Sequence, residues 1–98
     1  MRVNLTVLEF EWDKGNIDKN KKHDVEDKES EEIFFDGGKV ILKDKLHSSD
    51  SEERFIILGR TKKGRLLYLV FTKRGKRIRI ISARDTNKKE VYIYEETT

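Results

Sequence analysis

The chain has 98 residues, of which 42% are charged and 35% hydrophobic, and its formal net charge is +3. This size and composition predict a single domain, residues 1–98, with a modest core and a very polar surface. The absence of cysteine excludes disulfides, thiolate metal sites and cysteine nucleophiles. No apolar run is long enough to span a membrane, and the N-terminus lacks the apolar segment of a signal peptide, so we expect a soluble cytoplasmic protein.

The charges are unevenly distributed along the chain. Residues 9–36 contain eleven acidic and five basic residues, whereas residues 60–89 contain twelve basic residues and one acid, Asp85. The second half of the chain should therefore build a positive face. Such a face attracts phosphate backbones and also suits an acidic protein partner, and the sign of the charge does not choose between them.

The first third of the chain predicts one strand and two helices. The stretch Val3–Asp13 alternates as in a strand, with Val3, Leu5 and Val7 on one side and Phe10 and Trp12 beyond an offset. Asp13 is suited to cap a short polar helix that runs toward His23. The segment Asp24–Asp36 predicts a second helix, with its acids crowded at the start where the helix dipole favours them and two glycines at its end.

The middle of the chain predicts an antiparallel sheet. Lys39–Asp44 forms a short strand, and Leu46–Glu53 is a polar loop. Three stronger strand signals follow at hairpin spacings, with turns at 61–64 and 73–75. In the first of them, Phe55 and Ile57 should face one side and Ile56 and Leu58 the other. These three strands are Arg54–Arg60, Arg65–Thr72 and Lys76–Ser82.

The C-terminal segment predicts a helix, with a strand as the alternative. Asp85 or Thr86 can cap a helix that runs to Glu96. The residues "VYIY" also suit a strand, because β-branched and aromatic side chains favour sheets. The expected fold class is α+β, with N-terminal helices and one C-terminal helix packed on an antiparallel sheet of three or four strands.

Basic residues mark the last strand and its neighbours. Arg77 and Arg79 share one face of their strand, Arg84 lies just past its end, and Arg60 ends a neighbouring strand. Close guanidinium groups need compensating anions, and acids of the N-terminal helices are one source. Phosphate is the other, because the guanidinium fork binds phosphate oxygens in a bidentate manner. An RNA-cleaving site needs such cations together with a base and an acid, and metal is optional.

The remaining chemistry-bearing residues are few. The chain has no Walker loop, dinucleotide fingerprint or zinc spacing, so we expect no metal and no cofactor. His47 lies in a loop rich in acids, where it is either an exposed bystander or an acid or base. Nothing marks the strained turn of a serine nucleophile around Ser48 or Ser49.

Several blocks of the sequence, in order, resemble the BrnT toxin family. They are "FEWD", "KH", "EEIFFD", "HSSDSEERFIILGRT", "GRLLYLVFT" and "RIRIISAR", and they run from about Phe10 to Tyr94. Members of the family usually carry Gly after the histidine of "KH", where Asp24 stands here, and Gly suits a left-handed helix end.

The resemblance implies a RelE-like fold and a ribonuclease toxin of a type II toxin–antitoxin pair. It implies a BrnA-like antitoxin with a ribbon-helix-helix DNA-binding part, with two toxins and two antitoxins in a complex that binds its own operator DNA. The alternative is a non-catalytic protein that keeps the fold and the basic face and binds nucleic acid or the antitoxin as a co-repressor.

The resemblance also implies residue roles. Arg60, Arg77, Arg79 and Arg84 would bind phosphate and stabilise the transition state. His47 or His23 would act as acid or base, with Glu53 as an alternative base. A second set would contact RNA, with Tyr94 stacking on a base or positioning one; this set is Lys22, Lys73, Arg74, Lys76 and Tyr94.

Overall fold

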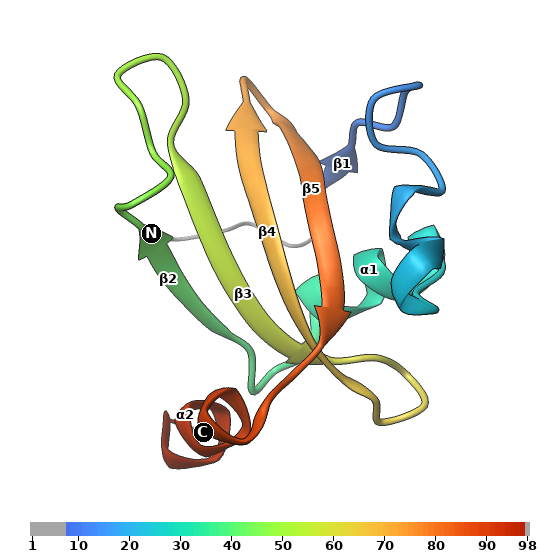
Figure 1. The fold of residues 1–98 in the computed structure, drawn as a ribbon, viewed down its shortest axis with the longest axis vertical. Coiled ribbons are helices and arrows are strands. Elements are labelled where there is room, and N and C mark those ends of the chain that lie inside the picture. The colour runs from blue at the N-terminus through green and yellow to red at the C-terminus, as the bar shows by residue number, and fades with distance from the viewer. Residues whose placement is uncertain (1–7, 98) are drawn as a thin grey trace.

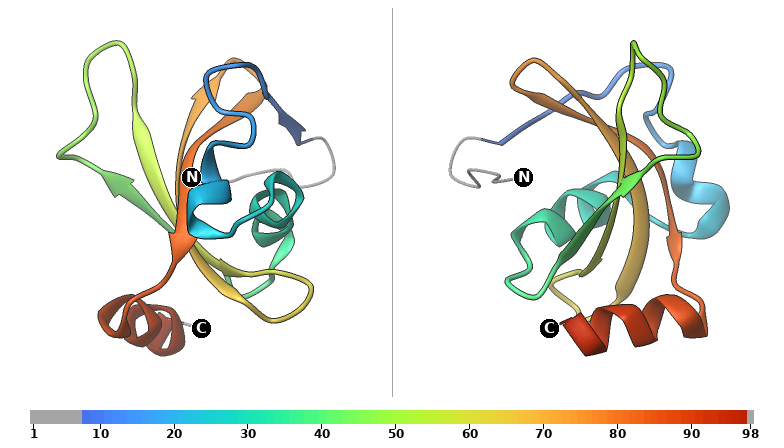
Figure 2. Two further views of the ribbon diagram at one scale, coloured as in Figure 1. Left: turned by 45° about the vertical axis from the view of Figure 1, so that its right-hand side comes forward. Right: turned by 90° about the vertical axis from the view of Figure 1, so that its left-hand side faces the viewer.

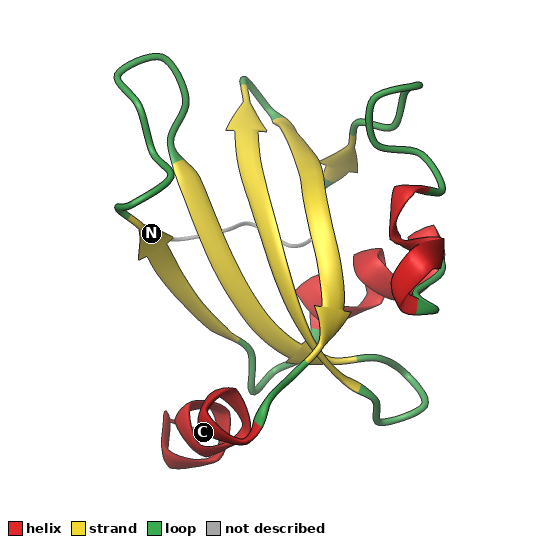
Figure 3. Cartoon of the chain, viewed as in Figure 1, coloured by secondary structure: helices red, strands yellow, loops and turns green. Residues whose placement is uncertain are grey.

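The structure is a computed structural model that describes residues 8–97. Its centre is a five-stranded sheet in the order β1-β5-β4-β3-β2, with the helical segments around it (Figures 1 and 3). The strands are β1 (Glu9–Phe10), β2 (Val40–Asp44), β3 (Arg54–Arg60), β4 (Leu66–Arg74) and β5 (Arg77–Asp85). The helical segments are the 3₁₀ turns η2 (Lys19–His23) and η3 (Ile33–Phe35) and the α-helices α1 (Asp27–Glu32) and α2 (Lys88–Thr97).

The α+β class is confirmed, but the prediction of a purely antiparallel sheet of three or four strands is wrong. Strands β2 to β5 are antiparallel, as their hairpin spacings predict. β1 adds a fifth strand parallel to β5, with Glu9 opposite Arg77. A hairpin cannot join parallel neighbours; here residues 11–39 carry the chain to the opposite edge of the sheet, and β2, β3 and β4 bring it back to β5. The strand predicted within Val3–Asp13 is confirmed in part, because β1 lies inside that stretch; its residues 3–7 lie outside the described residues.

The predicted helix after Trp12 is wrong. Lys14 to Asp18 form turns, and only the 3₁₀ segment η2 follows them. The Asn16 side chain explains this difference, because it accepts a hydrogen bond from the Asp13 N–H and donates to the carbonyls of Glu11 and Ile80. These side chain–backbone bonds compete with helix formation and tie the turn to the edge of β5.

The second helix forms, but it is shorter than the predicted segment Asp24–Asp36. Asp24 adopts the left-handed conformation, with φ 59°, at the end of η2. α1 then starts at Asp27, where Glu26 and Glu29 form a reciprocal capping box. The last turn tightens into η3 and ends before Asp36.

The C-terminal helix is confirmed, and the prediction of Asp85 or Thr86 as its cap is wrong. β5 continues to Asp85, and Asn87 caps α2. The Asn87 side chain accepts a hydrogen bond from the Glu90 N–H at 2.9 Å, and the Glu90 carboxylate accepts one from the Asn87 N–H at 3.0 Å. No helix within residues 8–97 is long and apolar enough to cross a membrane.

The sheet has two distinct faces. The core face packs against α1 and η3, with Ile33 and Phe34 against the strand residues Ile57 and Phe71. The opposite face, called the open face below, is covered at one end by α2, whose Tyr94 packs with Leu58 and Leu66 (Figures 1 and 2). The predicted alternation in β3 is confirmed, because Phe55 and Ile57 belong to the first cluster and Ile56 and Leu58 to the second.

A β-bulge interrupts β5. Phe71 of β4 pairs with Ile80, whereas the preceding Val70 pairs with Ser82, so Ile81 is an extra residue. Simple alternation from Arg79 would place Ser82 and Arg84 on the core face. The bulge instead places both on the open face with Arg79, and Ala83 joins the core.

Candidate functional site

Three residues in register across the open face form what we call the arginine row. Arg54 of β3 pairs with Thr72 of β4, and Thr72 pairs with Arg79 of β5. Asp44 of β2 extends the row beyond Arg54. Directly opposite side chains in antiparallel strands have Cβ atoms about 5 Å apart, so the row places Arg54 and Arg79 on one face, two strands apart, with Thr72 between them.

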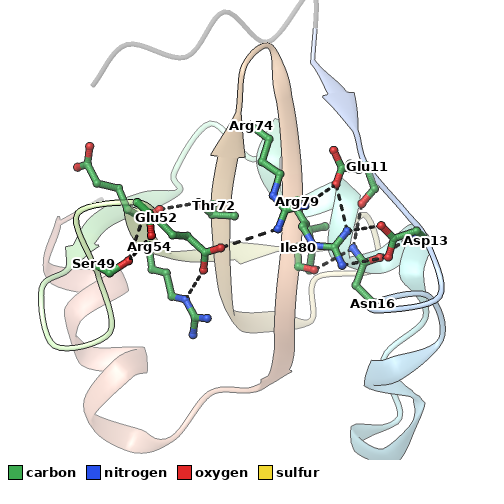
Figure 4. Close-up of polar contacts among 12 residues, drawn as sticks. Glu11, Asp13, Asn16, Ser49, Glu52, Arg54, Thr72, Arg74, Arg79 and Ile80 are labelled. Atoms are coloured by element: carbon green, nitrogen blue, oxygen red, sulfur yellow. Dashed lines mark hydrogen bonds and ion pairs between the residues drawn. The ribbon is translucent and has the colours of Figure 1, made fainter.

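Carboxylates from the N-terminal segment hold Arg79. Its Nη1 donates to Glu11 at 3.1 Å and to Asp13 at 2.8 Å, and its Nη2 donates to Asp13 at 3.0 Å (Figure 4). Hydrogen bonds from Arg79 lower the pKa of Asp13, and the same pairing raises the pKa of Arg79. Gly15 permits this arrangement, because a Cβ there would lie 2.7 Å from Arg79 Nη2.

The ion pairs continue across β4 to Arg54. Arg74 lies 3.2 Å from Glu11 and 3.9 Å from Glu52, and Arg54 Nε donates to Glu52 at 2.8 Å. Three arginines and three carboxylates therefore alternate along the open face (Figure 4). Internal compensation of the basic residues, one of the two readings that the sequence leaves open, is present in the structure.

Arg54 keeps donors free within this network. Of its guanidinium nitrogens, only Nε contacts another described residue, and Figure 4 shows the guanidinium projecting past Glu52 and away from Arg79. A cavity of about 180 Å³ opens beside it. Its lining includes one carboxylate, Glu52, and four cationic side chains, which are Lys19, Arg54, Arg74 and Arg79. The free N–H groups and this excess of positive lining suit an anionic ligand.

His47 stands at the β2 end of the arginine row. Its Nδ1 lies 2.9 Å from Oδ2 of Asp44, which is buried, while the imidazole itself is exposed. A carboxylate at Nδ1 favours the tautomer with the proton on that nitrogen and leaves Nε2 as an acceptor. The pair therefore presents a proton acceptor held by Asp44, the residue that pairs in register with Arg54.

The other basic site residues of β5 lie on the same face but differ in their contacts. Arg77 is exposed and lies 3.6 Å from Glu9. Arg84 lies 3.9 Å above the Tyr68 ring and donates to both oxygens of Glu90. Arg84 thus ties α2 to the sheet.

Arg60 and Tyr94 lie together at the opposite end of the sheet from the arginine row. The Arg60 guanidinium is 5.3 Å from the Tyr94 ring centroid, and the Tyr94 hydroxyl donates to Asp36 at 2.8 Å. Burial and this hydrogen bond raise the pKa of Tyr94. Burial opposes the lowered pKa of Asp36, but hydrogen bonds from Arg60, Gly38 and Tyr94 outweigh it. The Tyr94 ring is buried rather than open to a base.

The remaining site residues from the sequence are dispersed. Glu53 precedes β3 and lies two residues before Phe55, which faces the core. Its carboxylate lies 3.2 Å from Lys43 Nζ. Lys22 and His23 are exposed on η2, against the edge of β5. Lys73 and Lys76 are exposed near the β4–β5 turn. The structure thus joins His47, Arg74 and Arg79 around the arginine row and leaves the others outside it.

Sequence reasoning assigned no part in a functional site to Arg54, Asp44, Glu11 or Asp13. Arg54 lies in the block "HSSDSEERFIILGRT" and starts a predicted strand. Pairing that strand with the next one in the correct register would have placed Arg54 beside Thr72. The contacts of Glu11 and Asp13 depend on β1 and the Asn16 turn, which carry no comparable signal. Among residues 8–97, no group of three or more acidic or histidine side chains is arranged to hold a metal ion.

Comparison with known proteins identifies the family. No curated protein matches the chain. Residues 12–90 match the family described as the ribonuclease toxin, BrnT, of type II toxin–antitoxin systems. This match contains the arginine row, His47 and the whole antiparallel part of the sheet. Because the match covers most of the chain, the protein belongs to the BrnT family of ribonuclease toxins.

Proposed function

We propose that this protein is an endoribonuclease of the mRNA interferase type, with a RelE-like fold, that cleaves RNA on the open face of its sheet. The observation that carries the proposal is the arginine row with the His47–Asp44 pair at its end. The row offers guanidinium groups to a phosphate, and the pair offers a nitrogen base within the same surface. The family description supports RNA as the substrate.

The proposed reaction is a metal-independent transesterification. His47 Nε2 takes the proton of a ribose 2′-hydroxyl, whose oxygen forms a bond to the adjacent phosphorus. The bond from phosphorus to the 5′-oxygen breaks, and the histidine returns the proton to that oxygen. Arg54 and Arg79 stabilise the extra negative charge of the phosphorane, and a positioned general acid–base contributes about 10²- to 10⁴-fold.

The other basic residues extend this site. Arg77 and Arg84 flank Arg79 on the open face and would hold neighbouring phosphates. Exposed cations around the row raise the encounter rate with RNA; they are Lys22, Lys73, Arg74 and Lys76. His23, Glu53, Arg60 and Tyr94 lie outside the arginine row, and the proposed reaction does not use them.

The partner of a type II toxin is an antitoxin. We propose a BrnA-like ribbon-helix-helix protein, in a complex of two toxins and two antitoxins that binds operator DNA through the antitoxin. Acidic antitoxin residues would cover part of the arginine row, where they replace the contacts of an RNA phosphate. An affinity for antitoxin that is indifferent to ionic strength would count against this electrostatic contact.

Cleavage by matched variants tests the proposal. Arg54→Ala and His47→Ala should each reduce RNA cleavage by at least about 100-fold. Lys63→Ala removes a charge from the β3–β4 turn, at the far end of the sheet, and should cleave like wild type. Circular dichroism and thermal unfolding establish that each variant is folded. Full activity in the folded Arg54 and His47 variants would refute the site.

One observation favours a second function. Arg79, Arg74 and Arg84 are already paired with carboxylates, as expected of a basic face that serves structure alone. The alternative is a non-catalytic co-repressor that binds the antitoxin or nucleic acid. A wild-type protein that neither cleaves RNA nor arrests growth, yet binds its antitoxin, would establish this alternative.

A further inference from the structure

Ser82 occupies a position on the open face that only the bulge creates. It is half-buried, pairs in register with Val70, and lies on β5 between Arg79 and Arg84. β-bulges next to binding sites commonly redirect a side chain in this way. In a regular strand, side chains alternate between the two faces, so Ser82, three residues after Arg79, would face the core. The extra residue Ile81 shifts the alternation and places Ser82 on the open face.

The Ser82 hydroxyl has no structural partner among the described residues. Two other hydroxyls on the sheet and its loops are used: the buried Thr72 donates to the Glu53 carbonyl at 2.7 Å, and the half-buried Ser48 donates to the Asp44 carbonyl at 2.6 Å. Ser82 makes no such bond to residues 8–97, although two arginines flank it on the strand. A half-exposed hydroxyl can both donate and accept, so its free capacity is available to a ligand.

The surroundings of Ser82 favour one part of an RNA ligand. Its row across the sheet continues through Val70 and Ile56 to Leu42, and all three are aliphatic. The polar groups next to Ser82 are therefore the arginines along β5, which suit phosphates. The Ser82 hydroxyl lies between these arginines on β5. It can therefore contact the sugar–phosphate backbone of an RNA strand that runs along β5.

We infer that Ser82 is a substrate-contacting residue whose hydroxyl hydrogen-bonds the ribose–phosphate backbone of RNA held by Arg79. This inference rests on the proposed function. Because a backbone contact is the same at every nucleotide, Ser82 contributes affinity to all RNA sequences equally. It does not choose the cleavage sequence.

Kinetics on RNAs of several sequences test the inference. Ser82→Ala should raise KM about threefold to tenfold on every RNA, the loss expected for one hydrogen bond, and leave kcat and the cleavage sites unchanged. Ser82→Thr keeps the hydroxyl on a β-branched side chain and should restore the wild-type KM. Ser51→Ala removes a hydroxyl from the exposed β2–β3 loop and serves as the matched control.

The outcomes separate this inference from the proposed function. If wild type cleaves RNA and Ser82→Ala has the same KM, the inference is wrong and the proposed function stands. A change of cleavage sequence at unchanged KM would show a contact to the bases, which also overturns the backbone contact. If wild type does not cleave RNA at all, the proposed function fails and the inference fails with it.

Discussion

Arg79 and Arg54 lie in the arginine row but contribute differently to the stability of the fold. The Arg79 side chain is 13% exposed and binds both Glu11 and Asp13, whereas the Arg54 guanidinium contacts only Glu52 among the described residues. Arg79 therefore has a structural duty in addition to any contact with phosphate. Arg54 is the cleaner probe of function, because its removal leaves fewer groups unpaired.

This difference predicts unequal stabilities. Arg79→Ala leaves Asp13 without its cation and Glu11 paired with Arg74 alone, and should lower the free energy of unfolding by about 2 kcal/mol. Arg54→Ala breaks one partly exposed ion pair and should cost less than about 1 kcal/mol. Urea unfolding of both variants measures the two values. Equal losses would contradict the division of roles.

The pair of Arg65 and Asp85 gives a prediction about pH. A hydrogen bond from Arg65 holds the pKa of Asp85 below its usual 3.8. A carboxyl whose pKa is lower in the folded state than in the unfolded state stabilises the protein at any pH above the unfolded-state pKa. This stabilisation is lost as the pH falls through the folded-state pKa. Asp85→Asn should therefore be less stable than wild type at pH 7, by less than about 1 kcal/mol because the pair is solvent-exposed.

The control is the same comparison in acid. The difference in unfolding free energy between Asp85→Asn and wild type should shrink as the pH falls below 3.8 and vanish below the lowered pKa of folded Asp85, where the carboxyl is protonated in both states. A difference that persists unchanged into acid would show that Asp85 acts through packing rather than through its charge.

At the level of elements, β3 and η3 pack through Gly59. A Cβ at Gly59 would lie 2.9 Å from both the Ile33 Cβ and the Ile33 carbonyl oxygen, so the backbone must shift to admit it. Gly59→Ala should destabilise the fold by about 1–3 kcal/mol. Gly37→Ala is the matched control, because nothing lies within 4 Å of a Cβ there. Thermal unfolding compares the two, and a Gly59→Ala variant as stable as Gly37→Ala would disprove this packing.

The sequence predicted some elements well, for physical reasons. β3 was predicted with its final bounds, and β4 and β5 within a few residues, because alternating apolar residues between short turns determine strands locally. The helix after Trp12 failed because Asn16 bonds to β5, 64 residues away in the chain. The parallel pairing of β1 likewise depends on contacts between distant segments.

The site was harder to predict than the fold. Arg77 and Arg79 were placed on one face by alternation alone, which the structure confirms. The bulge at Ile81 changes the alternation after Ile80, so the face of Ser82 and Arg84 did not follow from their spacing. The partners of Arg79 come from Glu11 and Asp13, whose distance in sequence hides the ion pairs.

For the whole molecule, the charge distribution predicts how RNA binding responds to salt. A protein that neutralises phosphates of a single strand releases counterions, and log K falls with log salt by about 0.7 per phosphate contact. Arg54→Ala removes one proposed contact, so its slope should be shallower than that of wild type by about 0.7. Lys63→Ala should keep the wild-type slope. Identical slopes for all three proteins would place RNA away from the arginine row.

The most direct test of the account is RNA cleavage by the purified wild-type protein in the presence of EDTA, with analysis of the product ends. Attack by the 2′-hydroxyl with His47 as the base predicts fragments that end in a 2′,3′-cyclic phosphate and begin with a 5′-hydroxyl. Cleavage that EDTA abolishes, or fragments that begin with a 5′-phosphate, would contradict the proposed chemistry on the open face.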